Sequence, residues 1–139
     1  MKPGNKKFYI GVDVGGTSIK FGIFDYKKDM IDSFSIATVI REKNSENAII
    51  NDISNAIYGY CSDNKYNISK NKICGIGFAI PGSVVNNVVL KAININWTKK
   101  LDLVKITKNK LGKNINVKVY NDANAAALGE YTKYLNKKY

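Results

Sequence analysis

The spacing of apolar residues changes near residue 44, and this change restricts the possible folds more than any other feature. Before it, turn residues separate three apolar runs at residues 8–12, 19–24 and 31–39. Turn residues between neighbouring extended runs are typical of an antiparallel meander. After it, apolar residues recur every three or four positions over residues 49–60, which predicts one buried face of a helix.

The rest of the chain alternates between strand and helix patterns. The apolar run at residues 73–80 suits a parallel strand that is buried on both faces. Ser45 can cap the first helix, and Gly112 can end the second. The other predicted elements are, in chain order, two short strands within residues 84–95 around Asn86 and Asn87, a helix over residues 98–111, a strand over residues 115–120 and a helix from residue 123 to about 135.

This order of elements predicts an α/β fold built on one mixed sheet. Five strands are expected, an antiparallel meander followed by two parallel strands, with three helices on the faces of the sheet. The length of 139 residues is that of a single domain, and a hydrophobic content of 45% is sufficient to form a core. We therefore expect residues 1–139 to form one domain.

Composition indicates a cytoplasmic protein. No apolar run approaches the roughly 20 residues that span a bilayer, and no continuous apolar segment before Asp13 resembles that of a signal peptide. The two cysteines, Cys61 and Cys74, are too few for a disulfide scaffold and lack the paired spacing of metal ligands. They are typical of thiols in a reducing compartment.

The chain is basic, with 22 Lys and Arg residues against 11 Asp and Glu residues and a net charge of +11. Such a balance raises nucleic acid as a partner. The lysines are scattered, however, and they are not interleaved with aromatic residues as in an RNA-binding sheet. The pattern argues against a specific nucleic-acid partner, and a basic nucleic-acid-associated protein is kept as an alternative.

The segment from Asp13 to Thr17 has the composition of a phosphate site. Gly15 and Gly16 allow a sharp turn and a close approach to a ligand, and consecutive amides in such a turn can bind an anion. Thr17 adds a hydroxyl, and Asp13 can hold Mg²⁺ through water. This is not a Rossmann motif, because a strand and not a helix follows the glycines, and it is not a Walker motif, because the Gly-Lys-Ser/Thr sequence is missing. The alternative is that the two glycines only close a hairpin.

Asp122 is the leading candidate for a general base. It stands where a strand is expected to end and an alanine-rich helix to begin, and α/β folds carry their chemistry at this edge of the sheet. The chain contains no histidine, so a base here has to be a carboxylate, Tyr, Lys or Cys. The alternative for Asp122 is a helix N-cap, a role that the same side chain could fill at once.

Three motifs occur in an order that resembles the pattern of one protein family, and a fourth segment matches it loosely. Residues 11–25 look like a phosphate hairpin, residues 75–82 like a glycine- and proline-containing strand, and residues 121–130 like a catalytic signature. Residues 92–97 loosely match a sugar loop, with Ile93 in the place of the usual proline. The chain therefore resembles the amino-terminal lobe of the ROK family of sugar kinases and repressors, within the actin-like ATPase superfamily.

The resemblance implies a ribonuclease-H-like fold, ATP and Mg²⁺ as cofactors, and roles for individual residues. Asp122 would take the proton from a sugar hydroxyl, Asn121 would hydrogen-bond a neighbouring hydroxyl, and Asn94 would do likewise. The residues that would serve the terminal phosphates are Gly15, Gly16, Thr17 and Lys20, with Asp13 near the metal, although Lys20 also fits an exposed strand lysine.

The family pattern extends beyond this chain. Its second lobe carries the adenosine site, a second phosphate loop and a Cys/His zinc site, none of which is expected here. We therefore expect the amino-terminal half of a hexose kinase that is inactive alone and pairs with a carboxy-terminal lobe or a second copy. ROK repressors carry a DNA-binding segment before the first strand, whereas seven residues precede Phe8. The alternative function is a non-catalytic ROK-like binding or regulatory module.

Overall fold

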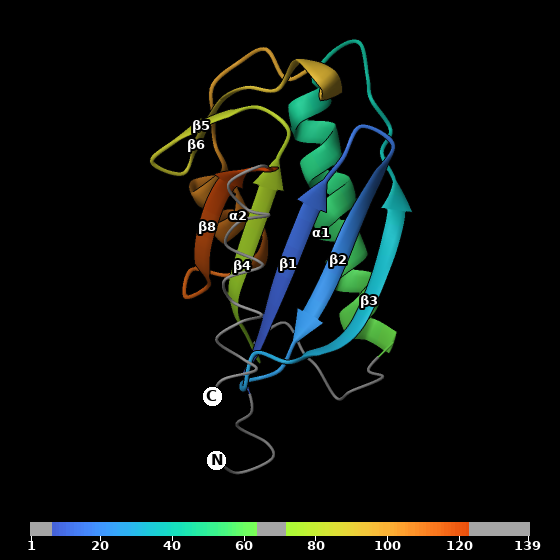
Figure 1. The fold of residues 1–139 in the computed structure, drawn as a ribbon, viewed down its shortest axis with the longest axis vertical. Helices are drawn as coiled ribbons and strands as arrows, with labels where there is room; N and C mark the ends of the chain where they lie inside the picture. The colour runs from blue at the N-terminus through green and yellow to red at the C-terminus, as the bar shows by residue number, and fades with distance from the viewer. Residues whose placement is uncertain (1–6, 64–71, 123–139) are drawn as a thin grey trace.

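The computed structural model describes residues 7–63 and 72–122, and its centre is a five-stranded sheet (Figure 1). The strands of this sheet are β1 (Phe8–Val14), β2 (Ser18–Phe24), β3 (Met30–Ala37), β4 (Ile73–Ile80) and β8 (Asn116–Asn121). Their spatial order is β3-β2-β1-β4-β8. The first three strands are antiparallel neighbours, whereas β1 and β4, and β4 and β8, run parallel. The predicted mixed sheet is therefore confirmed.

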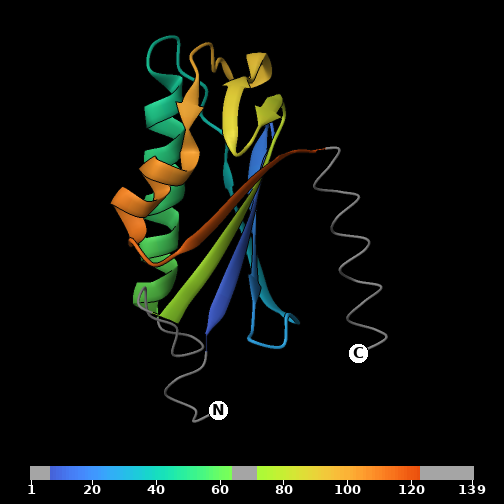
Figure 2. The same cartoon turned by 90° about the vertical axis from the view of Figure 1, so that its left-hand side faces the viewer.

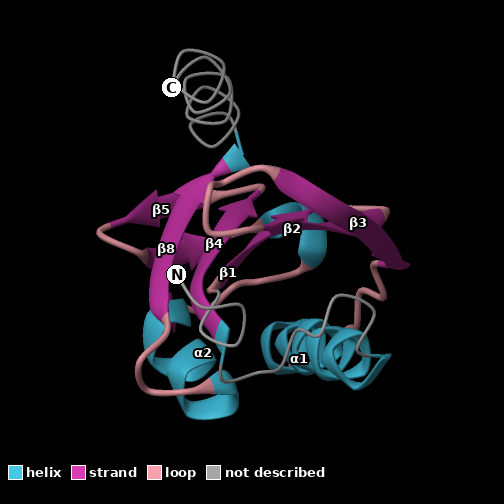
Figure 3. Ribbon diagram, turned by 90° about the horizontal axis from the view of Figure 1, so that it is seen from below, coloured by secondary structure: helices cyan, strands magenta, loops and turns pink. Residues whose placement is uncertain are grey.

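Two helices, α1 (Ser45–Asp63) and α2 (Leu103–Leu111), cover the same face of this sheet (Figure 2, Figure 3). Side chains alternate between the two faces along each strand, and those on the helix side are apolar and buried. Val12, Phe78 and Val119 form one such row across three strands, and none is more than 3% exposed. Neither of the two described helices is long and apolar enough to cross a membrane.

A second, three-stranded sheet contains β5 (Ser83–Val85), β6 (Val88–Lys91) and β7 (Leu101–Asp102). The two short strands predicted around Asn86 and Asn87 are thus confirmed. Both asparagines have left-handed backbone conformations, with φ of 49° and 67°, as a two-residue hairpin turn of type I′ requires. Asn87 Oδ1 accepts a hydrogen bond of 2.9 Å from the Val119 N–H, which attaches this hairpin to β8.

The helix predicted over residues 98–111 begins later, at Leu103. Leu101 and Asp102 instead pair with β6 as a short strand, and Asp102 Oδ1 caps α2 by accepting a hydrogen bond of 3.1 Å from the Lys105 N–H. The strand predicted to reach residue 39 ends at Ala37, where its partner β2 begins. Pairing with distant strands has therefore overruled the local pattern at both places.

Ser45 does not act as the predicted cap. It is the first residue of α1, and its hydroxyl donates a hydrogen bond of 2.8 Å to the Ile95 carbonyl oxygen. The third predicted helix, from residue 123 to about 135, lies outside the described residues.

Glu46, in the first turn of α1, fixes the loop that precedes β7. The residue is 8% exposed, and its Oε2 accepts hydrogen bonds from the N–H groups of Thr98 at 3.0 Å and Lys99 at 3.2 Å. Burial alone would raise the pKa of Glu46, but backbone N–H donors and the Lys99 charge outweigh it, so the pKa is lowered. The resulting stability is present above the pKa of the unfolded chain and is lost as the pH falls through the folded pKa.

We expect the free energy of unfolding to decrease as the pH falls below the ordinary glutamate pKa of about 4.5, partly through protonation of Glu46. Glu46→Gln should lower this free energy at neutral pH by about 1 kcal/mol and should flatten its pH dependence. Urea unfolding in neutral and acidic buffer measures both effects. Glu42→Gln, at an exposed position nearby, is the matched control. An unchanged pH dependence in Glu46→Gln would contradict the assignment.

Candidate functional site

The carboxyl ends of β1, β4 and β8 meet at one edge of the sheet, because these three strands run parallel (Figure 1). In the observed register Asp13 pairs with Ala79, and Ile80 pairs with Asn121. Asp122 directly follows the last residue of β8. Asp13 and Asp122 therefore lie at the same edge of the sheet.

The two glycines between β1 and β2 differ in what the fold demands of them. The Gly15 N–H donates a hydrogen bond of 3.0 Å to the Ser18 carbonyl oxygen and closes the turn. A Cβ atom on Gly15 would lie 2.8 Å from that same oxygen, so the turn requires glycine there. A Cβ atom on Gly16 would meet no atom within 4 Å. The described structure therefore leaves open space beside the Gly16 backbone. Residues 13–20 are called the glycine hairpin below.

Asp13 and Lys20 are paired across the two strands of the glycine hairpin, and both are exposed. Because Val12 and Val14 point into the core, Asp13 points to the face opposite the helices. A single exposed carboxylate suits Mg²⁺, which keeps most of its water ligands and binds through one or two carboxylates. Within residues 7–63 and 72–122, no three Asp, Glu or Cys side chains gather into a metal site.

The Asn94 loop, residues 92–99, lies beyond the end of β4 and is built on a buried tryptophan. Ala92 and Trp97 exchange two backbone hydrogen bonds of 2.9 Å, and Trp97 is fully buried. The turn η3 (Ile93–Ile95) carries the exposed Asn94 between them. Trp97, matched to a sugar loop in the sequence, thus serves the core. A hollow of about 200 Å³ is lined by Pro81, Gly82, Ser83, Lys91, Ile93 and Asn94.

Asn121 lines a different hollow, of about 300 Å³, between the β5–β6 hairpin and β8. Asn121 is half-buried, and Asp122 is exposed. Asn94 and Asn121 thus line two different hollows of the described structure. Polar side chains make up most of the lining of this hollow, which comprises Val84, Asn86, Asn87, Lys118, Val119, Tyr120 and Asn121.

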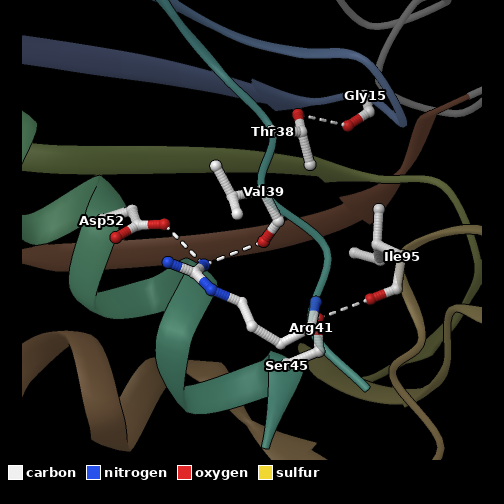
Figure 4. Close-up of polar contacts among 7 residues, drawn as sticks. All are labelled: Gly15, Thr38, Val39, Arg41, Ser45, Asp52 and Ile95. Atoms are coloured by element: carbon white, nitrogen blue, oxygen red, sulfur yellow. Dashed lines mark hydrogen bonds and ion pairs between the residues drawn. The ribbon is translucent and has the colours of Figure 1, made fainter. Parts of the chain in front are cut away.

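Sequence reasoning missed the residues that hold these parts together. Thr38 Oγ1 donates a hydrogen bond of 2.7 Å to the Gly15 carbonyl oxygen (Figure 4). Asn96 Nδ2 donates to the carbonyl oxygens of Arg41 at 2.8 Å and Glu42 at 3.1 Å. No motif marks either residue. Asn96 adopts a left-handed backbone conformation, with φ of 58°. Asparagine tolerates this conformation better than most residues, and this preference is the one feature of the sequence that could have indicated a turn at Asn96.

The mixed sheet and its two helices on one face define a ribonuclease-H-like fold, with polar groups at its carboxyl edge. Comparisons with known proteins identify the family of this chain. Residues 9–139 match the ROK family. The chain is 33% identical to a glucokinase of Halalkalibacterium halodurans over 91% of its own length, and 32% identical to an N-acetyl-D-glucosamine kinase of Aliivibrio salmonicida over 88%. The chain therefore belongs to the ROK family.

A solved ROK family glucokinase from Streptomyces griseus, in complex with glucose and AMPPNP, has the same fold. The TM-score is 0.66 at 31% identity, and the match covers 89% of this chain and 36% of that one. The expected ribonuclease-H-like fold is thereby confirmed. The chain spans 37% of the length of each of the two curated relatives named above.

The two glycines of the hairpin give a prediction about folding. Gly15→Ala should lower the free energy of unfolding by about 2 kcal/mol, because its methyl group would overlap the Ser18 carbonyl oxygen. Gly16→Ala should change it by less than about 0.5 kcal/mol, because space is open there. Thermal or urea unfolding of the two variants compares them directly. Equal losses in both variants would contradict this division of roles.

Proposed function

We propose that this chain is the amino-terminal lobe of an ATP-dependent hexose kinase, which transfers the γ-phosphoryl group to a sugar hydroxyl. The observation that carries the proposal is the meeting of the glycine hairpin and Asp122 at one carboxyl edge of a ROK family lobe. One group there suits phosphate, and the other suits a hydroxyl that has to lose its proton.

Asp122 is the proposed general base. Asp122 is exposed and directly follows β8, an edge strand that is held in register by its pairing with β4. In phosphoryl transfer the protein mainly positions the reactants and balances charge, and an aspartate accepts the proton of the attacking hydroxyl. Asn121, half-buried at the adjacent position, would hydrogen-bond a neighbouring sugar hydroxyl, and Asn94 would contact the sugar from the loop beyond β4.

The glycine hairpin is the proposed phosphate contact. The open space at Gly16 admits a phosphate oxygen close to the backbone, and the Thr17 hydroxyl and the Lys20 ammonium group stand on the same hairpin. Asp13 would hold Mg²⁺ through water. The metal ion, when bound, neutralises charge on the phosphates.

Relatives named as acting on glucose and N-acetyl-D-glucosamine support a hexose or an N-acetylated hexose as the substrate class. Because those relatives extend well beyond the matched part, contacts to adenosine and the second half of the phosphate site would come from outside these 139 residues. Catalysis depends on groups preorganised on both sides of the reacting atoms. The proposed lobe therefore needs a complement, either a carboxy-terminal lobe or a second copy.

We expect no phosphorylation of glucose or N-acetyl-D-glucosamine by residues 1–139 alone. A coupled assay for ADP release at high protein concentration measures this, with Asp122→Asn as the control. Turnover that disappears in Asp122→Asn would contradict the expected inactivity, and it would show that a second copy completes the site. Turnover that survives in Asp122→Asn would contradict the role of Asp122 as the base.

Ligand binding tests the proposed function directly. Titration of the ¹⁵N-labelled chain with MgAMPPNP should shift the amide signals of Gly15, Gly16 and Thr17, and glucose should shift those of Asn121 and Asp122. Gly16→Ala should weaken nucleotide binding by about tenfold, because its methyl group displaces hydrogen-bonded phosphate. Gly59→Ala, on the exposed surface of α1 with equally open space, is the matched control. Unchanged hairpin signals at millimolar nucleotide would overturn the proposal.

A further inference from the structure

The segment between β3 and α1 contacts both the glycine hairpin and the Asn94 loop (Figure 4). Residues 38–46 are called the strap here. At one end, the hydroxyl and the N–H of Thr38 donate to the carbonyl oxygens of Gly15 at 2.7 Å and Thr17 at 2.9 Å. At the other end, the Ser45 hydroxyl donates to the Ile95 carbonyl oxygen at 2.8 Å. The strap therefore connects the glycine hairpin to the Asn94 loop.

The bond from Thr38 fixes the direction of one peptide group. The carbonyl oxygen of Gly15 and the N–H of Gly16 belong to the same planar, trans peptide, so they point to opposite sides. Since the Gly15 oxygen points to Thr38, the Gly16 N–H points away from the strap. A peptide between two glycines can rotate more freely than any other. The Thr38 hydroxyl supplies a restraint that the hairpin sequence itself lacks.

The strap is itself attached to α1. Arg41 donates to the Val39 carbonyl oxygen at 2.8 Å and forms an ion pair of 2.7 Å with Asp52 (Figure 4). Both charged side chains are about one-third exposed, at 34% and 30%, so the ion pair contributes modestly. The Arg41 and Glu42 carbonyl oxygens also accept from the Asn96 side chain. Thr38 thus belongs to a segment that several hydrogen bonds and one ion pair hold in place.

We propose that Thr38 is a positioning residue for the phosphate contact: its hydroxyl holds the Gly15–Gly16 peptide so that the Gly16 N–H is directed toward a phosphate oxygen. The binding of phosphate by the Gly16 N–H rests on the proposed kinase function. The orientation of the Gly15–Gly16 peptide by Thr38 does not depend on that function. In this proposal the Thr38 hydroxyl acts through the Gly15 carbonyl oxygen and does not itself contact the ligand.

The test compares three variants of the full chain. Thr38→Val removes the hydroxyl at nearly constant shape and should weaken MgAMPPNP binding by about five- to tenfold, the usual effect of one hydrogen bond. Thr38→Ser keeps the hydroxyl and should stay within about twofold of wild type. Thr107→Val removes another threonine hydroxyl, which is buried on α2 and bonds to no described residue, and should leave binding unchanged.

A second measurement is made without ligand. Amide hydrogen exchange and chemical shifts of Gly16 and Thr17 should change in Thr38→Val and be restored in Thr38→Ser. Thr38→Ala, which also lacks the hydroxyl, repeats the test should Thr38→Val fold poorly. If wild type binds no MgAMPPNP but these hairpin signals respond as expected, the kinase function fails while control of the peptide stands. Wild-type hairpin signals in the variants lacking the hydroxyl, or no rescue by serine, would overturn the proposal.

Discussion

Burial of one row of side chains determines where the candidate site lies. Val12, Phe78 and Val119 are register partners across β1, β4 and β8, and all three point toward the helices. A shift of any strand by one residue would turn its apolar side chains to the opposite face, at a cost of roughly 1.5–3 kcal/mol for each one exposed. This packing fixes the register of β1, β4 and β8, so their carboxyl ends lie at the same edge of the sheet. Asp13 and Asp122 consequently share an edge although more than a hundred residues separate them.

The glycines within each of the two main motifs differ in how closely the fold packs against them. Gly75 and Gly82, in the motif at residues 75–82, are closely packed, whereas Gly77 of the same motif has open space beside it. A Cβ atom would lie 2.8 Å from the Tyr9 ring at Gly75 and 2.1 Å from the Lys91 carbonyl oxygen at Gly82. Gly16 has no such neighbour. A motif match alone could not separate closely packed glycines from glycines beside open space.

Periodic patterns predicted most of the fold, because each strand and helix is amphipathic or apolar over its own length. The meander, α1, β4, β8 and the hairpin at Asn86 and Asn87 follow from such local patterns. The start of α2 could not be predicted in this way, since pairing of Leu101 with the distant Val89 decides it. The edge on which Asp13 and Asp122 lie was also predictable. The contact of Thr38 with Gly15 was not, because it joins positions 23 residues apart through a loop without a motif.

The strap has a consequence for how a two-lobed kinase would work. Closure of two lobes excludes water and completes the catalytic groups, and a site that also had to assemble within one lobe would lose part of its binding free energy to that ordering. Here the Gly15 carbonyl oxygen and the Ile95 carbonyl oxygen are both bonded to residues 38–46, and Glu46 holds Thr98 and Lys99. The glycine hairpin and the Asn94 loop are therefore anchored to one segment at the start of α1. Under the proposed function, closure would carry both as a single preorganised unit, so the ordering free energy is supplied during folding of the lobe and not during each turnover.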